Sequence, residues 1–163
     1  MVDSLSVRQF VIDGALGARE ALPRDLYRCT SRVMDITLDT SILLAVICGE
    51  PSRDRAIGLT TGHTLIAPSS LHWEVGNALS AMLKRERMTL GQANACVAAY
   101  LKVPIKLVDI ELKHAMAVVN KVCAYAYDAY MLVCAQQSGS PILTLDGALK
   151  AHAESLGIEV LEI

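Results

Sequence analysis

The chain has 163 residues, of which 53% are apolar and only 4% aromatic, and its formal net charge is −2. This composition is typical of one globular domain with an aliphatic core, and it excludes a disordered chain and a globally basic nucleic-acid-binding protein. The longest apolar runs, such as residues 42–48, are far shorter than the roughly 18 residues that a membrane-spanning helix needs. The five cysteines form no CxxC motif, and the N-terminus lacks the pattern of a signal peptide, so we expect a reduced, cytoplasmic protein.

Residues 1–33 differ in pattern from the rest of the chain. One short apolar stripe is interrupted there by Gly14, Gly17 and Pro23, which are residues that break regular structure. We therefore expect residues 1–33 to be an N-terminal appendage, either disordered or translated from an upstream start. Residues 34–163 are expected to form the folded domain.

From residue 34 onward, short apolar strands alternate with helical patterns. The predicted strands cover residues 34–38, 64–67, 105–108, 142–145 and 158–161. The predicted helices cover residues 41–48, 54–61, 71–87, 89–102, 111–122, 127–137 and 147–155. Pro68 and the two serines after it mark the start of the third helix, with a serine available as its cap. This alternation predicts an α/β fold with a mainly parallel sheet.

Four carboxylates occupy unusual places in this pattern. Asp39 and Asp146 each follow a predicted strand and precede a helix, and ligands bind at that edge of an open α/β sheet. Glu74 lies in the first turns of the helix over 71–87, among apolar neighbours, and Asp128 begins an almost wholly apolar helix. We expect these four side chains, which come from separate elements, to converge at one edge of the sheet.

Four converging carboxylates require a charge that offsets their repulsion. Two carboxylates without a cationic partner repel each other by about 1 kcal/mol in a water-like dielectric, and by several times more when they are partly buried. A hard divalent cation offsets this repulsion, and Mg²⁺ or Mn²⁺ prefers oxygen ligands. The reaction class that fits is phosphodiester hydrolysis, in which one or two such metals activate water and neutralise the phosphate.

Each carboxylate also has a purely structural interpretation. Asp39 and Asp146 could be helix N-caps, and Glu74 could be a buried acid satisfied by His72 or Asn77. Asp128 could be an acid in the first turn of its helix, where the helix dipole favours a negative charge. The ordered set of four is more specific than any single member.

Four short motifs occur in order along the chain: Leu38-Asp39-Thr40-Ser41, Glu74-Val75-Gly76-Asn77-Ala78-Leu79, Tyr127-Asp128-Ala129-Tyr130 and Thr144-Leu145-Asp146. With this order and spacing, residues 36–163 resemble the PIN-domain ribonucleases, and especially the VapC toxins of toxin–antitoxin pairs. The resemblance implies a PIN-like (Rossmann-like), mainly parallel central sheet flanked by helices.

The resemblance also implies a site, a cofactor and partners. It implies that four carboxylates bind Mg²⁺ or Mn²⁺ and catalyse the cleavage of RNA, namely Asp39, Glu74, Asp128 and Asp146. It implies that four polar side chains orient these carboxylates, namely Thr40, Ser41, Asn77 and Thr144. The implied partners are an RNA substrate, a VapB-type antitoxin and a second copy of the chain, with no membrane. The apolar residues 43–48 are expected to form the wall of the groove in which the antitoxin docks.

Other functions remain open at this point. One is a PIN nuclease that matures RNA without an antitoxin, and another is a non-catalytic PIN-like scaffold. A haloacid-dehalogenase-type hydrolase needs an acid two residues after its nucleophile, where this chain has Ser41. Tyr125, Tyr127 and Tyr130 could stack RNA bases, although packing in the core or at its rim is the commoner role.

Overall fold

The computed structural model describes residues 33–163, so the predicted appendage, apart from Val33, lies outside the described residues. The division at residue 33 therefore stays a prediction. Within 33–163 the chain forms five strands: β1 (Asp35–Leu38), β2 (Thr64–Pro68), β3 (Ile105–Val108), β4 (Ile142–Leu143) and β5 (Val160–Leu161). The same part of the chain forms seven helices: α2 (Thr40–Cys48), α3 (Arg53–Thr60), α4 (Leu71–Lys84), α5 (Leu90–Tyr100), α6 (Leu112–Val122), α7 (Ala126–Ser138) and α8 (Gly147–Ser155).

All the strands pair in parallel, in the order β3-β2-β1-β4-β5. The chain moves from β1 outward to β3 and then crosses back to place β4 on the other side of β1. The order therefore reverses between β1 and β4, and ligands bind outside the carboxyl ends of strands at such a point. Leu38 pairs with Leu143 there, and the backbone N–H of Asp39 donates to the carbonyl of Leu143 at 3.1 Å. The α/β prediction is confirmed, and the sheet is parallel throughout these residues.

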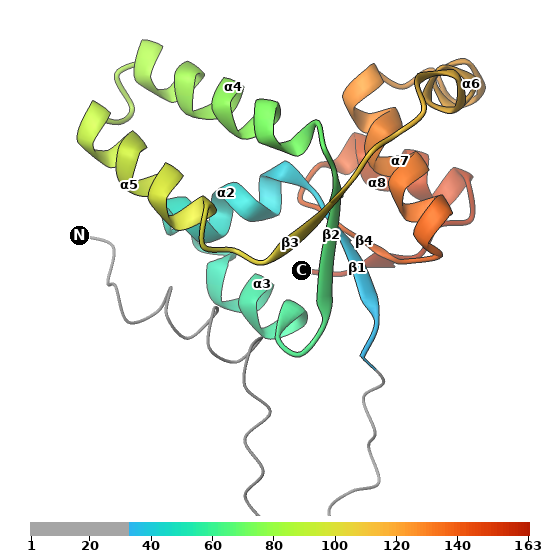
Figure 1. The fold of residues 1–163 in the computed structure, drawn as a ribbon, viewed down its shortest axis with the longest axis horizontal. Coiled ribbons are helices and arrows are strands. Elements are labelled where there is room, and N and C mark those ends of the chain that lie inside the picture. Colours follow the sequence, from blue (N-terminus) through green and yellow to red (C-terminus); the bar gives the residue numbers. More distant parts are fainter. Residues whose placement is uncertain (1–32) are drawn as a thin grey trace, which may run out of the picture.

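The helices form two layers, one on each side of the sheet. Figure 1 shows α2 to α5 on one side and α6 to α8 on the other. Their packing follows the same division, because α2 contacts α3, α4 and α5, whereas α7 contacts α6 and α8. Both faces of the sheet are covered, which explains why three successive residues of the central strand β1, residues 36–38, are all buried although their side chains point to alternate faces.

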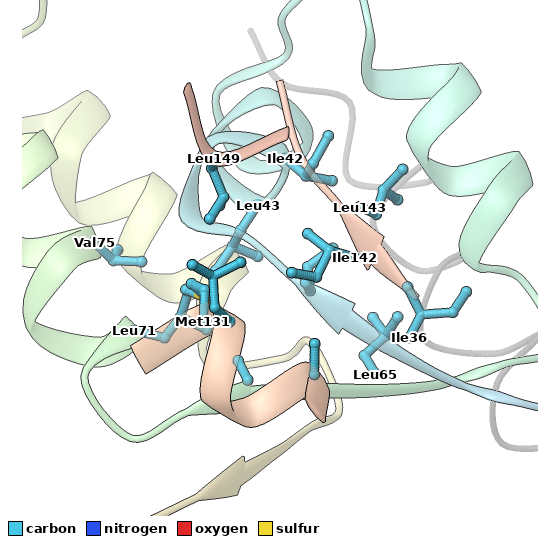
Figure 2. Close-up of a cluster of buried hydrophobic side chains, with 14 of the residues drawn as sticks. Ile36, Ile42, Leu43, Leu65, Leu71, Val75, Met131, Ile142, Leu143 and Leu149 are labelled. Atoms are coloured by element: carbon cyan, nitrogen blue, oxygen red, sulfur yellow. The ribbon is translucent and has the colours of Figure 1, made fainter. Parts of the chain in front are cut away.

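The core lies between the sheet and these two layers. Figure 2 shows Ile36, Leu65 and Ile142 from the strands, together with Leu43 from α2 and Met131 from α7, all of which are buried. Leu43, Ala45, Val46 and Ile47 are at most 7% exposed because α2 packs against three other helices and contributes to the common core cluster. The prediction that residues 43–48 form the wall of a docking groove is therefore wrong: most of that stretch belongs to the chain's own core.

Several predicted boundaries shift by a few residues. The helix expected over 71–87 ends at Lys84, and Glu86 has a positive φ of 55° that no helix continues. The strand expected over 142–145 stops at Leu143, because the side chain of Thr144 makes the next hydrogen bonds. The start of α5 is as expected, since Thr89 and Gln92 form a capping box. None of the described helices is long and apolar enough to cross a membrane.

Candidate active site

Asp39 connects the end of β1 to the start of α2 and is only 8% exposed. Its Oδ1 accepts a hydrogen bond from the backbone N–H of Thr40 at 2.7 Å, and its Oδ2 accepts one from the N–H of Ser41 at 3.3 Å. The hydroxyls of Ser41 and Thr144 also donate to Oδ2, the latter at 2.7 Å. The carboxylate is therefore an N-cap, as one interpretation of the sequence proposed, and its orientation is fixed by the start of α2 and by Thr144, which follows β4.

Thr144 links the ends of β1 and β4. Its side chain is fully buried, and its hydroxyl donates to Asp39 while it accepts from the backbone N–H of Asp146 at 2.9 Å. Asp146 in turn caps α8, since its Oδ1 accepts from the N–H groups of Ala148 and Leu149 at 2.7 and 3.1 Å. The Oδ2 of Asp146 has no hydrogen-bond partner within residues 33–163 and remains available to a ligand.

Glu74 reaches the same edge from α4. The hydroxyl of Thr40 donates to its Oε2 and the hydroxyl of Ser70 to its Oε1, both at 2.9 Å. Burial is the main cause that raises the pKa of Glu74 above its usual value, and the negative charges of Asp39 and Asp128 raise it further. The two hydroxyls only partly offset this effect.

Asp128 completes the group from the first turn of α7. Burial is again the main cause that raises its pKa, followed by the negative charges of Asp146 and Asp39. The imidazole of His152 and a backbone hydrogen bond from Tyr125 act in the opposite direction. Glu74 and Asp128 are thus harder to ionise mainly because they are buried, and the charges of neighbouring acids of the group add to this effect, so the structure does bring the four predicted acids together.

The orienting residues agree with the prediction only in part. Thr40, Ser41 and Thr144 hydrogen-bond to the carboxylates as expected. Asn77 is exposed, and within the described chain no hydrogen bond joins it to a carboxylate. Ser70, expected as a capping residue, makes no side-chain cap bond and instead orients Glu74. The sequence did offer a signal for this contact, because Ser70 and Glu74 are four residues apart and such residues lie on the same face of a helix.

Two further residues at this edge escaped the sequence interpretation. His152 on α8 was assigned no role, yet its charge acts on Asp128. Asp109 directly follows β3, and its Oδ1 accepts a hydrogen bond from the hydroxyl of Ser69 at 2.6 Å. An acid directly after a predicted strand is the signal that identified Asp39, and the same signal would have identified Asp109.

The donor set suits a hard divalent cation. It consists of oxygen atoms only, and the ion pairs found within residues 33–163, His114–Glu111 and Lys150–Glu162, leave all four carboxylates without a cationic partner. The side chains are close enough to influence one another's pKa, but no three acidic, histidine or cysteine side chains in the described part of the chain already lie at metal-ligand spacing. Binding of a cation would therefore need rotamer adjustments of the less constrained carboxylates.

Replacing Thr144 by valine tests how the site is held together. Thr144→Val keeps the shape of the side chain but leaves the N–H of Asp146 without its acceptor and removes one donor from Asp39. We expect the free energy of unfolding to fall by about 1–3 kcal/mol. Any nuclease activity should fall about 10–100-fold, as for other residues that orient metal ligands.

The matched control is Thr144→Ser, which keeps the hydroxyl and loses only a methyl group. Urea denaturation of both variants measures the difference. Equal stability and equal activity of the valine and serine variants would show that the hydroxyl does not hold the site.

Comparison with known proteins places this geometry in a family. The PIN domain family model matches residues 36–155, whereas no curated protein matches the sequence. The crystal structure of PAE2754 from Pyrobaculum aerophilum has the same fold, with a TM-score of 0.61 and 22% identity over 83% of this chain and 95% of that chain. The structure of VapBC2 from Rickettsia felis bound to a DNA fragment from their promoter gives a TM-score of 0.55 and 16% identity over 79% and 98%. The match of the family model over most of the described residues, on a fold with this parallel sheet, shows that the chain belongs to the PIN domain family.

Proposed function

We propose that the protein is an endoribonuclease that depends on Mg²⁺ or Mn²⁺. Members of the PIN family are typically nucleases, and the proposal assigns that activity to the carboxyl edge of β1 and β4. The residues proposed to hold the metal and to carry the catalysis are Asp39, Glu74, Asp128 and Asp146.

The observation that carries this proposal is the mutual effect of the carboxylates. The pKa values of Glu74 and Asp128 stay raised, in part by Asp39 and Asp146, although the charge of His152 opposes the rise at Asp128, and no ion pair within residues 33–163 involves any of the four carboxylates. A fold selected only for stability has no reason to gather four acids in this way, whereas perturbed pKa values in a cluster are typical of functional sites.

The proposed role of the neighbouring hydroxyls is to fix the carboxylates before substrate binds. When bound, a divalent cation supplies positive charge that neutralises the phosphate and activates water. Thr40 and Ser70 each hold one oxygen of Glu74, so that both oxygens are oriented at the same time. The hydroxyls of Ser41 and Thr144 both donate to Oδ2 of Asp39. Oδ1 of Asp39 accepts a single hydrogen bond, from the backbone N–H of Thr40, and keeps a free lone pair.

The direct test is cleavage of a fluorogenic single-stranded RNA by the purified full chain. We expect cleavage with Mg²⁺ or Mn²⁺ at neutral pH, and intact RNA when either ion is chelated. A folded protein that cleaves no RNA with either metal would contradict the nuclease proposal and favour a non-catalytic scaffold.

We further propose that the nuclease is a VapC-like toxin of the cytoplasm, which acts as a homodimer and is restrained by a VapB-type antitoxin. The support is the similarity in fold to a chain of the VapBC2 structure, of which this chain covers 98%. The competing proposal is an RNA-maturation nuclease without an antitoxin.

Expression in a bacterial host separates these two proposals. Induction of the full chain without a partner should arrest growth, and Glu74→Gln should restore it because the amide cannot replace the carboxylate. The matched control Glu154→Gln changes an exposed acid on α8 and should remain toxic. Normal growth with abundant, RNA-cleaving wild-type protein would favour the maturation nuclease.

A further inference from the structure

A pocket of about 300 Å³ lies beside the acidic site, at the carboxyl ends of β2 and β3. It is lined by Pro68, Ser69, Ser70, Asp109, Ile110 and Tyr130. Ser70 belongs to both places, since it lines the pocket and its hydroxyl donates to Glu74. A group bound in the pocket would therefore lie next to a group bound at the carboxylates.

The walls of the pocket suit a flat, heteroaromatic ligand. Ile110 and Pro68 are apolar, and Tyr130 offers an aromatic ring that packs edge-on against Tyr127, with ring centroids 5.9 Å apart and planes at 87°. Pockets that are mostly apolar with a few placed polar groups bind small organic groups. Aromatic side chains at the mouth of a nuclease site are suited to stack an unpaired RNA base.

Asp109 supplies the polar group that would choose among bases. The hydroxyl of Ser69 donates to its Oδ1 and fixes the carboxylate, while its Oδ2 has no hydrogen-bond partner within residues 33–163. A carboxylate can accept two parallel hydrogen bonds. Guanine presents two adjacent donors, N1–H and the N2 amino group, whereas adenine, cytosine and uracil each place an acceptor beside their donor.

We propose that this pocket binds a guanine base of the RNA adjacent to the cleaved bond, with Tyr130 stacking on the base and Asp109 accepting hydrogen bonds from N1–H and the N2 amino group. The inference rests on the proposed ribonuclease function and adds a base preference to it. Asp109 is separate from the four-carboxylate group, because its charge does not contribute to the raised pKa of Glu74 or of Asp128.

The test is binding of short, non-cleavable 2′-O-methyl oligouridines that carry one guanine, inosine or adenine, measured by fluorescence anisotropy with Mg²⁺. The wild type should bind the guanine oligomer about tenfold more tightly than the adenine one, with inosine in between because it lacks the N2 amino group. In Asp109→Asn the amide replaces one acceptor by a donor, so the preference for guanine should disappear.

Two further variants separate base reading from charge and from stacking. Glu111→Gln removes an exposed negative charge two residues away and should keep the full preference for guanine. Tyr130→Phe should retain the affinity, whereas Tyr130→Leu should weaken binding of all three oligomers alike. A thermal melt of each variant confirms that it is folded.

The outcomes distinguish this inference from the proposed function. A guanine preference that depends on Asp109, in a protein that cleaves no RNA, would support the pocket and contradict the nuclease. RNA cleavage by a protein whose base preference is absent, or unchanged in Asp109→Asn, would overturn the pocket assignment and leave the nuclease standing.

Discussion

Asp39→Asn is expected to lower the rate of RNA cleavage more than about a hundredfold without unfolding the protein. Removing residues that merely orient a metal ligand already lowers activity 10–100-fold, and Asp39 is proposed as a ligand itself. The fold should survive because asparagine is an N-cap as good as aspartate and its one oxygen can still accept from the N–H group of Thr40. The hydroxyl of Thr144 can rotate to accept from the new amide.

The matched control for this experiment is Asp35→Asn. Asp35 is an exposed residue at the opposite end of β1, so the same chemical change on the same strand lies at the other edge of the sheet. Cleavage rates and thermal melting of both variants give the comparison. Equal cleavage by folded Asp39→Asn and wild type would contradict the placement of the catalytic site at the carboxyl edge.

Removal of divalent metal is expected to abolish cleavage and to lower the melting temperature together. Cleavage should stop in excess EDTA and return when Mn²⁺ or Mg²⁺ is restored. Because the metal binds the folded site and not the unfolded chain, it should stabilise the protein in proportion to its concentration relative to its dissociation constant. Differential scanning fluorimetry across a metal titration measures this shift, which Asp39→Asn should largely remove.

The pH dependence of this stabilisation follows from Glu74 and Asp128. Their pKa values are raised in the folded protein above the ordinary values of 4.5 and 3.8, so the folded state binds more protons than the unfolded state. In EDTA their contribution to stability is therefore present below about pH 4 and is lost as the pH rises through the raised pKa values. A divalent cation should offset that loss, so that the metal-dependent shift in melting temperature grows with pH.

Glu74→Gln provides the control for this dependence. The amide keeps hydrogen-bond partners in the hydroxyls of Thr40 and Ser70 but carries no charge. In EDTA at neutral pH the variant should melt above the wild type, and its stability should vary less with pH. A variant that melts below the wild type in EDTA and keeps the same pH dependence would show that the Glu74 charge is not destabilising.

The sequence alone determined the elements and the positions of the acids within them. Strands such as 105–108 and helices such as 147–155 follow from short apolar runs, from helical periodicity and from residues such as Thr89 that cap a helix locally. These are effects of neighbouring residues on the backbone, so a single sequence carries them. The placement of Asp39 and Asp146 directly after strands is local in the same sense.

Only the tertiary structure decided which strand ends lie side by side and what surrounds each carboxylate. The bond between Thr144 and Asp39 joins residues 105 positions apart and exists because β4 pairs with β1 after the chain crosses back. Thr40 holds Glu74, where the sequence offered His72 and Asn77, because α2 and α4 pack on the same side of the sheet. Asp109 lines a pocket because β3 pairs with β2, which brings the residues that follow the two strands together. Such contacts depend on strand order and on helix packing. The same local sequence pattern is compatible with several strand orders and packings, so the pattern alone does not determine these contacts.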